Sequence, residues 1–301
     1  MGSMVGQRLG TYLLIAEIGR GSMGVVYQAQ HSGTGQVVAV KVLLESLAED
    51  QSFVTRFTRE ARIVQALQHP NIVHLYEMGH DHGHLYFAME YFAGQTAGQM
   101  LRQHGRIEVS AVIEIAAQAA DALHHAHTHG HLVHRDIKPE NLLVDRWCRV
   151  KVLDFGLARI EGAQSITKVG TVVGSLYYVS VEQLLGRQID GRADVYSLGV
   201  SMYEMLTGRR PYRGRTLNEM TEAIVSGKAP APSRLEPSVP PALEAIIHRA
   251  MERDLTRRYA SADELHRDLR ALQAQRAAQN GATATGGPEL PHAPGSQGAA
   301  R

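Results

Sequence analysis

The chain of 301 residues contains a single cysteine, Cys148, so an internal disulfide is excluded. The small disulfide-stapled scaffolds of secreted proteins are excluded with it, and a lone thiol fits a reducing compartment. We therefore expect this part of the protein to be cytoplasmic. For the thiol itself, a buried structural role is favoured over a reactive one.

Long hydrophobic runs are also missing. No apolar stretch reaches the length of about 18 residues that a membrane span needs, and the apolar segment 111–123 is interrupted by Glu114, Gln118 and Asp121. We expect no membrane span here, although an anchor beyond residue 301 is compatible with the sequence. The N-terminus lacks an apolar signal core, and residues 1–7 are interpreted as leader residues.

Neither sign of charge predominates. The 31 Lys and Arg residues face 30 Asp and Glu residues, which gives a formal net charge of +1. A strong field for polyanions is therefore excluded, and no nucleic-acid partner is expected.

Histidine is abundant, and one run is dense enough to suggest a metal site. It comprises His124, His125, His127, His129, His131 and His134. Helical spacing of three or four residues would give two loose pairs. Gly130 is the expected C-cap of the helix, which would send the last two histidines elsewhere. A physiological zinc site is thus the less favoured reading, and adventitious nickel or zinc binding is expected.

The pattern along the chain predicts an α+β protein with two lobes. The first ninety residues read as short β-branched and aromatic strands, interrupted by one helical pattern over 52–67. Helices are then predicted over 109–127, 191–207, 216–226, 241–251 and 262–275. The Ala-, Gly- and Pro-rich stretch 273–301 is predicted to be a disordered tail or linker.

A glycine-rich pattern near the N-terminus suggests a phosphate site. Gly19, Gly21 and Gly24 follow the spacing G-x-G-x-x-G, which lets backbone N–H groups approach phosphate oxygens. A dinucleotide-binding turn would continue into a helix, whereas the segment 24–30 reads as a strand. We therefore predict a hairpin over phosphates, with a plain glycine-rich hairpin as the alternative.

A lysine and a glutamate complete this candidate site. Lys41 lies on a later predicted strand and supplies a compact charge for phosphates. Glu60, midway along the helical pattern, is the candidate carboxylate that orients it. Solvent-exposed positions for both remain the alternative when these residues are taken alone.

Seven motifs in one order resemble those of the eukaryotic-like (Hanks-type) Ser/Thr protein kinases, especially their bacterial members. They are the glycine pattern at Gly19, VAVK ending at Lys41, HRDIKPEN from His134, DFG from Asp154, SVEQ with Glu182, DVYSLG from Asp194, and RRYASADEL with Arg258. The resemblance covers residues 8–272. It implies a bilobal protein-kinase fold, with a small antiparallel sheet and one key helix over about 8–92 and a mainly helical lobe over about 93–272.

The resemblance also implies the chemistry, that of a non-specific serine/threonine protein kinase that uses ATP and Mg²⁺, with Mn²⁺ as an alternative metal. Asp136 would orient the substrate hydroxyl and Lys138 would neutralise the γ-phosphate. Asn141 and Asp154 would hold the metal ions. Lys41, paired with Glu60, would contact the α- and β-phosphates.

An adenine pocket between the lobes is implied as well. Met89 would guard its back, while Glu90 and Phe92 would offer backbone hydrogen bonds to the base. The remaining contacts are implied to come from Ile18, Val26, Ala39 and Leu143, together with the glycines Gly19, Gly21 and Gly24. Ordinary core packing is the alternative for each apolar residue taken singly.

Regulation by phosphorylation of the loop after DFG is implied by Arg135, which precedes Asp136. We hypothesise that phosphorylated Thr167 or Thr171 docks on the basic residues Arg135, Arg159 and Arg56. The phosphate would come from a second copy of the kinase in a dimer. A flexible loop with incidental hydroxyls is the alternative.

Two positions depart from the family pattern. Val181 stands where the family usually has proline, and Ser175 where it usually has threonine. These changes bear on how protein substrates dock and leave the ATP chemistry intact. A nucleotide-binding scaffold without turnover is the second reading of the whole chain, and it would require a missing catalytic group, whereas every such group is present.

Overall fold

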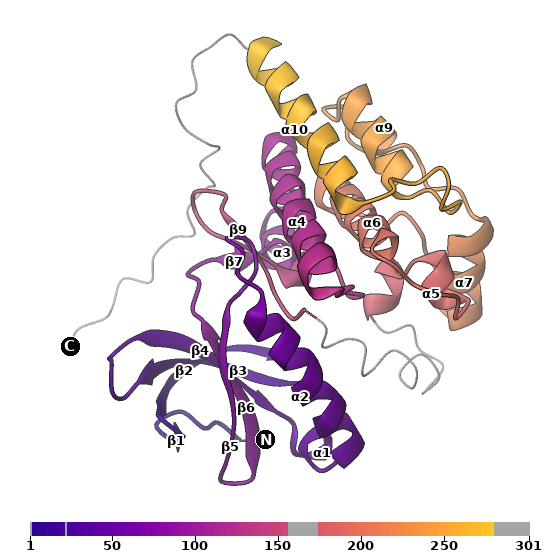
Figure 1. Cartoon of the computed structure of the whole chain (residues 1–301). Helices are drawn as coiled ribbons and strands as arrows, with labels where there is room; N and C mark the ends of the chain where they lie inside the picture. The colour runs from indigo at the N-terminus through magenta and orange to yellow at the C-terminus, as the bar shows by residue number, and fades with distance from the viewer. Residues whose placement is uncertain (1, 22, 156–173, 280–301) are drawn as a thin grey trace.

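The β-branched segments near the N-terminus form one antiparallel sheet in the smaller of two lobes, as the computed structural model shows (Figure 1). The structure describes residues 2–21, 23–155 and 174–279, without the side chains at 52, 56, 57, 174 and 175. The strands are β1 (Arg8–Leu9), β2 (Tyr12–Gly21), β3 (Gly24–His31), β4 (Val37–Leu43), β5 (Leu75–Asp81) and β6 (His84–Glu90), in the order β1-β2-β3-β4-β6-β5.

This sheet is covered on both faces, which explains its near-continuous apolar sequence. In β4 every residue after Val37 is buried, because the strand lies between two clusters of apolar side chains. Helices α1 (Glu45–Ala48) and α2 (Gln51–Ala66) belong to one face, where Phe53 of α2 packs on Leu43 and Phe87 of the sheet. The predicted strands and the predicted helix are confirmed.

The first residues of the chain pack on the sheet. Met4 is buried at 5% exposure in the other sheet cluster, and the N–H of Gly6 donates to the carbonyl of Leu14 at 2.8 Å. Burial of the methionine side chain holds this segment on the sheet, and the interpretation of residues 1–7 as leader residues stays a prediction.

The larger lobe is mainly helical, as predicted. Its helices are α3 (Ala97–His104), α4 (Val109–Gly130), α5 (Val181–Leu184), α6 (Arg192–Thr207), α7 (Leu217–Ser226), α8 (Pro232–Leu235), α9 (Pro241–Ala250) and α10 (Ala262–Gln279). The 3₁₀ helices η1 (Pro139–Asn141) and η3 (Gly174–Tyr178) and a sheet of β7 (Gln95–Thr96), β8 (Leu142–Val144) and β9 (Val150–Val152) complete it. No helix within these described parts is long and apolar enough to cross a bilayer.

Helix α4 lies at the centre of this lobe, against α6 and α10 (Figure 1). Its N-cap is Glu108, whose carboxylate accepts from the N–H of Ser110, so the serine lies in the first turn. At the other end the left-handed residue is His131, with φ of 48°, rather than Gly130. Gly130 is still helical, and a Cβ there would come within 3.3 Å of Ile63 and Leu67.

Helix α10 runs further than expected. It continues to Gln279, past the boundary at residue 272 where the sequence predicted a tail. Gln273 donates to Glu114 of α4 at 2.6 Å and Arg270 donates to the same carboxylate at 2.7 Å, which anchors the last turns. Alanine and glutamine are also good helix formers, so composition alone misplaced this end.

A short segment before β5 joins the two lobes. The N–H of Val152 in β9 donates to the carbonyl of Asn71 at 2.8 Å, and the N–H of Val73 donates back to Val152 at 3.2 Å. The amide of Asn71 also donates to Gln118 of α4 at 2.8 Å. Residues 71–73 are therefore held by the larger lobe, even though β5 of the smaller lobe begins soon after them, at Leu75.

Candidate active site

The glycine-rich segment forms the tip of the β2–β3 hairpin. Gly21 pairs with Gly24 in an antiparallel register, and β3 follows without a helix. A Cβ on Gly24 would lie 2.0 Å from the carbonyl oxygen of Val42, so glycine is required there by close backbone approach. The predicted hairpin is confirmed, and a dinucleotide-binding turn is excluded.

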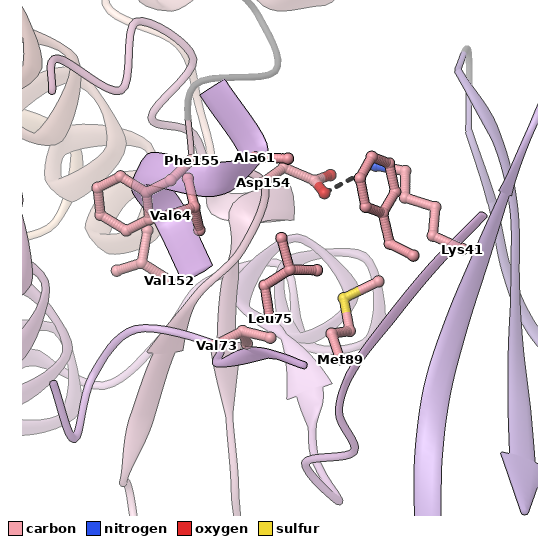
Figure 2. Close-up of a pocket in the computed structure, with 10 residues that line it drawn as sticks. Lys41, Ala61, Val64, Val73, Leu75, Met89, Val152, Asp154 and Phe155 are labelled. Carbon is pink, nitrogen blue, oxygen red and sulfur yellow. Dashed lines mark hydrogen bonds and ion pairs between the residues drawn. The ribbon is translucent and has the colours of Figure 1, made fainter. Parts of the chain in front are cut away.

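The ammonium of Lys41, on β4, lies 2.7 Å from Oδ1 of Asp154, just after β9 (Figure 2). A buried ammonium requires a close counter-charge, and here the other lobe supplies it. Burial alone would raise the pKa of Asp154, but the charge and hydrogen bond of Lys41 outweigh it and hold this pKa below its usual range. Asp154 is therefore anionic at neutral pH.

Glu60 is the carboxylate that was expected to pair with Lys41. Glu60 is buried on α2 with 7% of its surface exposed. Between these two described side chains the Lys41–Glu60 ion pair predicted from the resemblance is not formed, since the lysine contacts Asp154. The sequence motifs carry no information on which carboxylate a buried ammonium contacts.

The segment after His134 brings three polar side chains together. The ammonium of Lys138 lies 2.6 Å from Oδ2 of Asp136. The amide of Asn141 donates to the backbone carbonyl of Asp136 at 2.7 Å and to its Oδ2 at 3.1 Å. The side-chain oxygen of Asn141 is thereby directed away from Asp136, and the carboxylate of Asp136 is fixed by two donors.

Buried polar groups of other segments hold this segment in place. The carboxylate of Asp194 accepts from the N–H groups of His134 and Arg135 at 2.7 and 2.8 Å. The ring of His134 meets Phe155 edge to face at 4.7 Å, and its Nε2 bonds the carbonyl of Leu153 at 2.7 Å. His134 and Asp194 therefore have a structural role and hold the backbone that carries Asp136.

A pocket lies between the sheet and α2, and Lys41 and Asp154 stand at one side of it (Figure 2). It is partly open to solvent and is lined by Lys41, Ala61, Val64, Val73, Leu75, Phe87, Met89, Val152, Asp154 and Phe155. Of these, Lys41, Met89 and Asp154 were predicted as site residues. The apolar remainder was missed, because the periodicity that marks Val64 as core does not distinguish a filled core from a pocket wall.

The residues predicted around adenine lie on both lobes. Ala39 of β4 is the register partner of Met89 on β6, and Glu90 ends that strand. Leu143 lies on β8 of the larger lobe. Val26 lies on β3, Ile18 lies on β2 with 44% exposure, and Phe92 follows β6.

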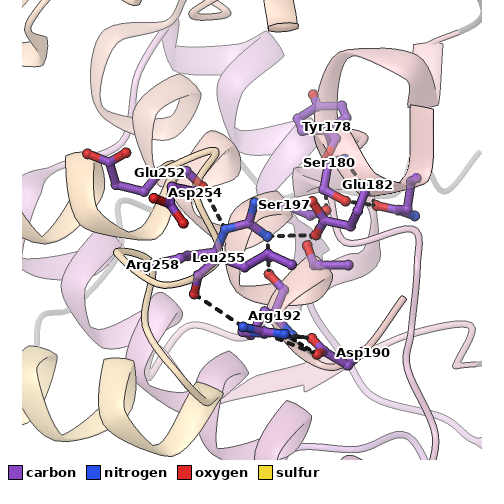
Figure 3. A network of polar contacts seen from close by, with 12 residues as sticks. Tyr178, Ser180, Glu182, Asp190, Arg192, Ser197, Glu252, Asp254, Leu255 and Arg258 are labelled. Atoms are coloured by element: carbon purple, nitrogen blue, oxygen red, sulfur yellow. Dashed lines mark hydrogen bonds and ion pairs between the residues drawn. The ribbon is translucent and has the colours of Figure 1, made fainter. Parts of the chain in front are cut away.

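A second buried ion pair anchors the segment around α5 (Figure 3). Arg258 donates from Nη1 to Oε1 of Glu182 at 2.7 Å and from Nη2 to Oε2 at 3.2 Å. Its remaining donors reach the carbonyls of Arg192 and Glu252, and its guanidinium lies 5.1 Å from the ring of Tyr196. This pair joins two of the motifs noted in the sequence, and Glu182 lies beside Val181 at the start of α5.

The predicted regulatory residues are mostly outside the described part of the chain. This holds for Thr167, Thr171 and Arg159, and for the side chains of Arg56 and Ser175. Arg135 is described, with a left-handed φ of 69°.

Two histidines of the run stack on one another, and a histidine from outside the run lies beside them. His125 stacks on His129 with ring centroids 4.2 Å apart, and His69 lies 4.9 Å from His125 on the other side. Asp121 lies 3.4 Å from Nε2 of His69. Within residues 2–21, 23–155 and 174–279, no group of three or more His, Cys, Asp and Glu side chains is arranged to hold a metal ion.

Comparison with known proteins identifies the arrangement. The model of the protein kinase domain matches residues 12–269. The serine/threonine-protein kinase PrkC of Bacillus subtilis is 36% identical over 268 residues, which cover 89% of this chain and 41% of PrkC. PknH of Mycobacterium tuberculosis is 35% identical over 263 residues, or 87% of this chain and 42% of PknH. The chain thus spans about two fifths of these relatives.

The fold agrees with a solved structure as well. The crystal structure of the PknI kinase domain of Mycobacterium tuberculosis superimposes with a TM-score of 0.70 and 28% identity, covering 90% of this chain and 99% of that one. The expected bilobal fold is confirmed. The chain belongs to the protein kinase domain family.

Proposed function

We propose that this chain is a serine/threonine protein kinase domain that transfers the γ-phosphate of ATP to hydroxyl groups of proteins. The observation that carries the proposal is the cluster of Asp136, Lys138 and Asn141 beside the Lys41–Asp154 pair. The N–H of Leu153, the residue before Asp154, donates to the carbonyl of Asn141 at 2.9 Å and so joins the two groups. The printed names of the bacterial relatives, which are serine/threonine-protein kinases, support the choice of acceptor.

Each polar group has a task in this proposal. Asp136, held by two donors, accepts the hydrogen bond of the acceptor hydroxyl and orients its oxygen toward the γ-phosphate. Lys138, 2.6 Å from Asp136, is close enough to stabilise negative charge on the transferred group. Lys41 binds the α- and β-phosphates, and the Gly19–Gly24 hairpin covers them with backbone N–H groups.

The residues present fit divalent metal ions. Asp154 offers an anionic carboxylate, and Asn141 directs its amide nitrogen to Asp136, which leaves its oxygen as a neutral ligand. Such hard oxygen ligands suit Mg²⁺, and Mn²⁺ is the alternative. When bound, the metal would neutralise phosphate charge. Met89, Glu90, Phe92 and the apolar contacts Ile18, Val26, Ala39 and Leu143 would hold the adenine.

Loop phosphorylation belongs to the same proposal. Phosphorylated Thr167 or Thr171 would dock on Arg135, Arg159 and Arg56, and a transient dimer of two copies would supply the phosphate. The positive charge of Arg135, next to Asp136 in the chain, supports this docking site for a phosphate. Phosphopeptide mapping of active protein would detect the modification, and an active chain unmodified at both threonines would disprove it.

The decisive experiment compares the protein with Asp136→Asn in the presence of Mg²⁺ and radiolabelled ATP. Loss of the carboxylate should reduce phosphate transfer by at least about a hundredfold. Binding of ADP should remain within about twofold, because Asp136 faces the acceptor rather than the adenine. Equal incorporation by both proteins would refute the assignment of Asp136.

A further inference from the structure

A single lysine of the larger lobe joins three chain segments behind the pocket. The ammonium of Lys151, on β9, lies 2.7 Å from Oε2 of Glu90 and donates to the carbonyl of Ile72 at 3.2 Å. Oε2 of Glu90 also accepts from the N–H of His74 at 3.2 Å, and the N–H of Glu90 donates to the carbonyl of His74 at 2.8 Å. The end of β6 is therefore tied to β9 through one carboxylate.

Burial makes this bridge different from a surface ion pair. The side chains of Lys151 and Glu90 are 13% and 27% exposed, so solvent screens them little. Pairs of this kind add little net stability, because desolvation offsets the attraction, but they hold groups in one geometry. Both charged atoms also make a backbone contact, which fixes their positions further.

The position of the bridge connects it to the nucleotide. Lys151 is the register partner of Leu143, whose side chain is the expected floor of the adenine pocket. Glu90 is the residue whose backbone is expected to bind the base. Because the side chains of register partners lie on the same face of a sheet, Lys151 lies beside Leu143. Its ion pair with Glu90 joins Leu143 to the strand end that is expected to bind the base.

We infer that Lys151 is a positioning residue for nucleotide binding, which sets the backbone at Glu90 against Leu143 by holding the Glu90 carboxylate. The inference rests on the proposed function, since it assumes that this pocket binds ATP. Lys151 itself need not touch the nucleotide. Its effect should therefore appear in affinity for nucleotide and not in the rate of phosphate transfer from bound ATP.

Lys151→Met removes the charge and keeps the apolar stem. It should weaken ADP binding, and raise KM for ATP, by about five- to tenfold, the scale of one ordinary hydrogen bond, because the lysine acts on the nucleotide only through Glu90. The rate kcat at saturating ATP should stay within about twofold. Lys151→Arg should restore affinity, because a guanidinium can still reach the Glu90 carboxylate.

Glu90→Gln removes the other charge and leaves the backbone unchanged. If the two side chains act as one unit, the double variant Lys151→Met with Glu90→Gln binds ADP no more weakly than either single variant. Lys228→Met is the matched control, since Lys228 is exposed, follows α7 in the larger lobe and does not line the pocket. Its affinity should equal that of the unaltered protein, and thermal unfolding of all variants monitors folding.

Two results would overturn the inference. One is an ADP affinity of Lys151→Met equal to that of Lys228→Met. The other is losses in the two single variants that multiply in the double variant. ADP binding is measured without turnover, so a chain that binds ADP and transfers no phosphate would disprove the proposed function while the binding comparison still decides the role of Lys151.

Discussion

The ammonium of Lys41 and Oδ1 of Asp154 lie 2.7 Å apart, so one ion pair joins β4 of the smaller lobe to the end of β9 in the larger lobe. In the proposed reaction these two groups face different parts of the nucleotide: Lys41 its phosphates and Asp154 its metal ions. The pair compensates a buried ammonium and a partly buried carboxylate with each other where the two lobes meet.

Replacing Lys41 tests this pairing directly. Lys41→Met should raise the pKa of Asp154, because burial still disfavours the carboxylate and the compensating ammonium is gone. A titration of the aspartate carboxyl signals by NMR would measure it. Phosphate transfer should fall by at least about a hundredfold. Lys228→Met serves as the control, and an unchanged Asp154 titration in Lys41→Met would contradict the prediction.

The Glu182–Arg258 pair should dominate the stability of the segment around α5. The arginine side chain is fully buried and that of Glu182 is 5% exposed, so Glu182→Gln leaves an uncompensated guanidinium. The expected loss is about 3–5 kcal/mol in the free energy of unfolding, measured by urea denaturation. A loss below about 1 kcal/mol would show that the pair is dispensable.

A matched control for that measurement is Arg267→Met on α10. Arg267 pairs with Asp263 at 2.9 Å, but the two side chains are 68% and 40% exposed. The expected change is below about 0.5 kcal/mol, as for other exposed pairs one helical turn apart. The contrast separates burial from the mere presence of an ion pair.

The histidine stack should make stability depend on pH. Burial lowers the pKa of His69 and of His125, and the neighbouring imidazoles lower both further, while Asp121 opposes this. The unfolded chain therefore binds more protons than the folded one as pH falls from about 6.5, the ordinary histidine pKa, through the lowered values. Stability present above pH 6.5 is lost over that range.

His125→Phe keeps an aromatic ring at the centre of the stack and removes its proton. Its free energy of unfolding should fall less between pH 7.5 and pH 5 than that of the unaltered chain, as chemical denaturation at each pH would show. His104→Gln, at an exposed position, should leave the pH profile unchanged. Parallel profiles for His125→Phe and the unaltered chain would exclude the stack as the cause.

Two glycines of the β2–β3 hairpin distinguish a steric requirement for glycine from a general effect on chain flexibility. Gly24→Ala should cost about 1–3 kcal/mol, because its Cβ would lie 2.0 Å from the Val42 carbonyl. Gly21→Ala, with nothing within 4 Å of its Cβ, should cost much less. Both are measured by thermal unfolding, and equal losses would show that hairpin entropy, rather than the clash, governs this turn.

Much of the site was predictable because catalytic residues occur in short local motifs. HRDIKPEN places Asp136, Lys138 and Asn141 within six residues, so the segment that carries them also sets their mutual distances. The glycine hairpin was predictable for a similar reason, since the β-branched residues after Gly24 exclude a helix. The longer strands of the smaller lobe and the longer helices followed from periodicity, whereas α3 and the short strands β7, β8 and β9 were not predicted.

The predicted end of a helix was wrong where tertiary contacts outweigh local preference. The sequence predicted this helix over 262–275 and a tail from residue 273, but α10 continues to Gln279. Arg270 and Gln273 contact Glu114 of α4, which holds the helix at the point where the tail was expected to begin. These contacts with a distant segment leave no pattern in the residues around them.

The sequence by itself determined the family, the two-lobed fold and the identity of the polar groups at the site, because each depends on residue types at fixed local spacing. Only the tertiary structure decided which charges meet. It paired Lys41 with Asp154 rather than Glu60, and joined Lys151 to Glu90 across 61 positions of the chain. Ion pairs between distant segments depend on how the lobes pack, and packing is a property of the whole chain.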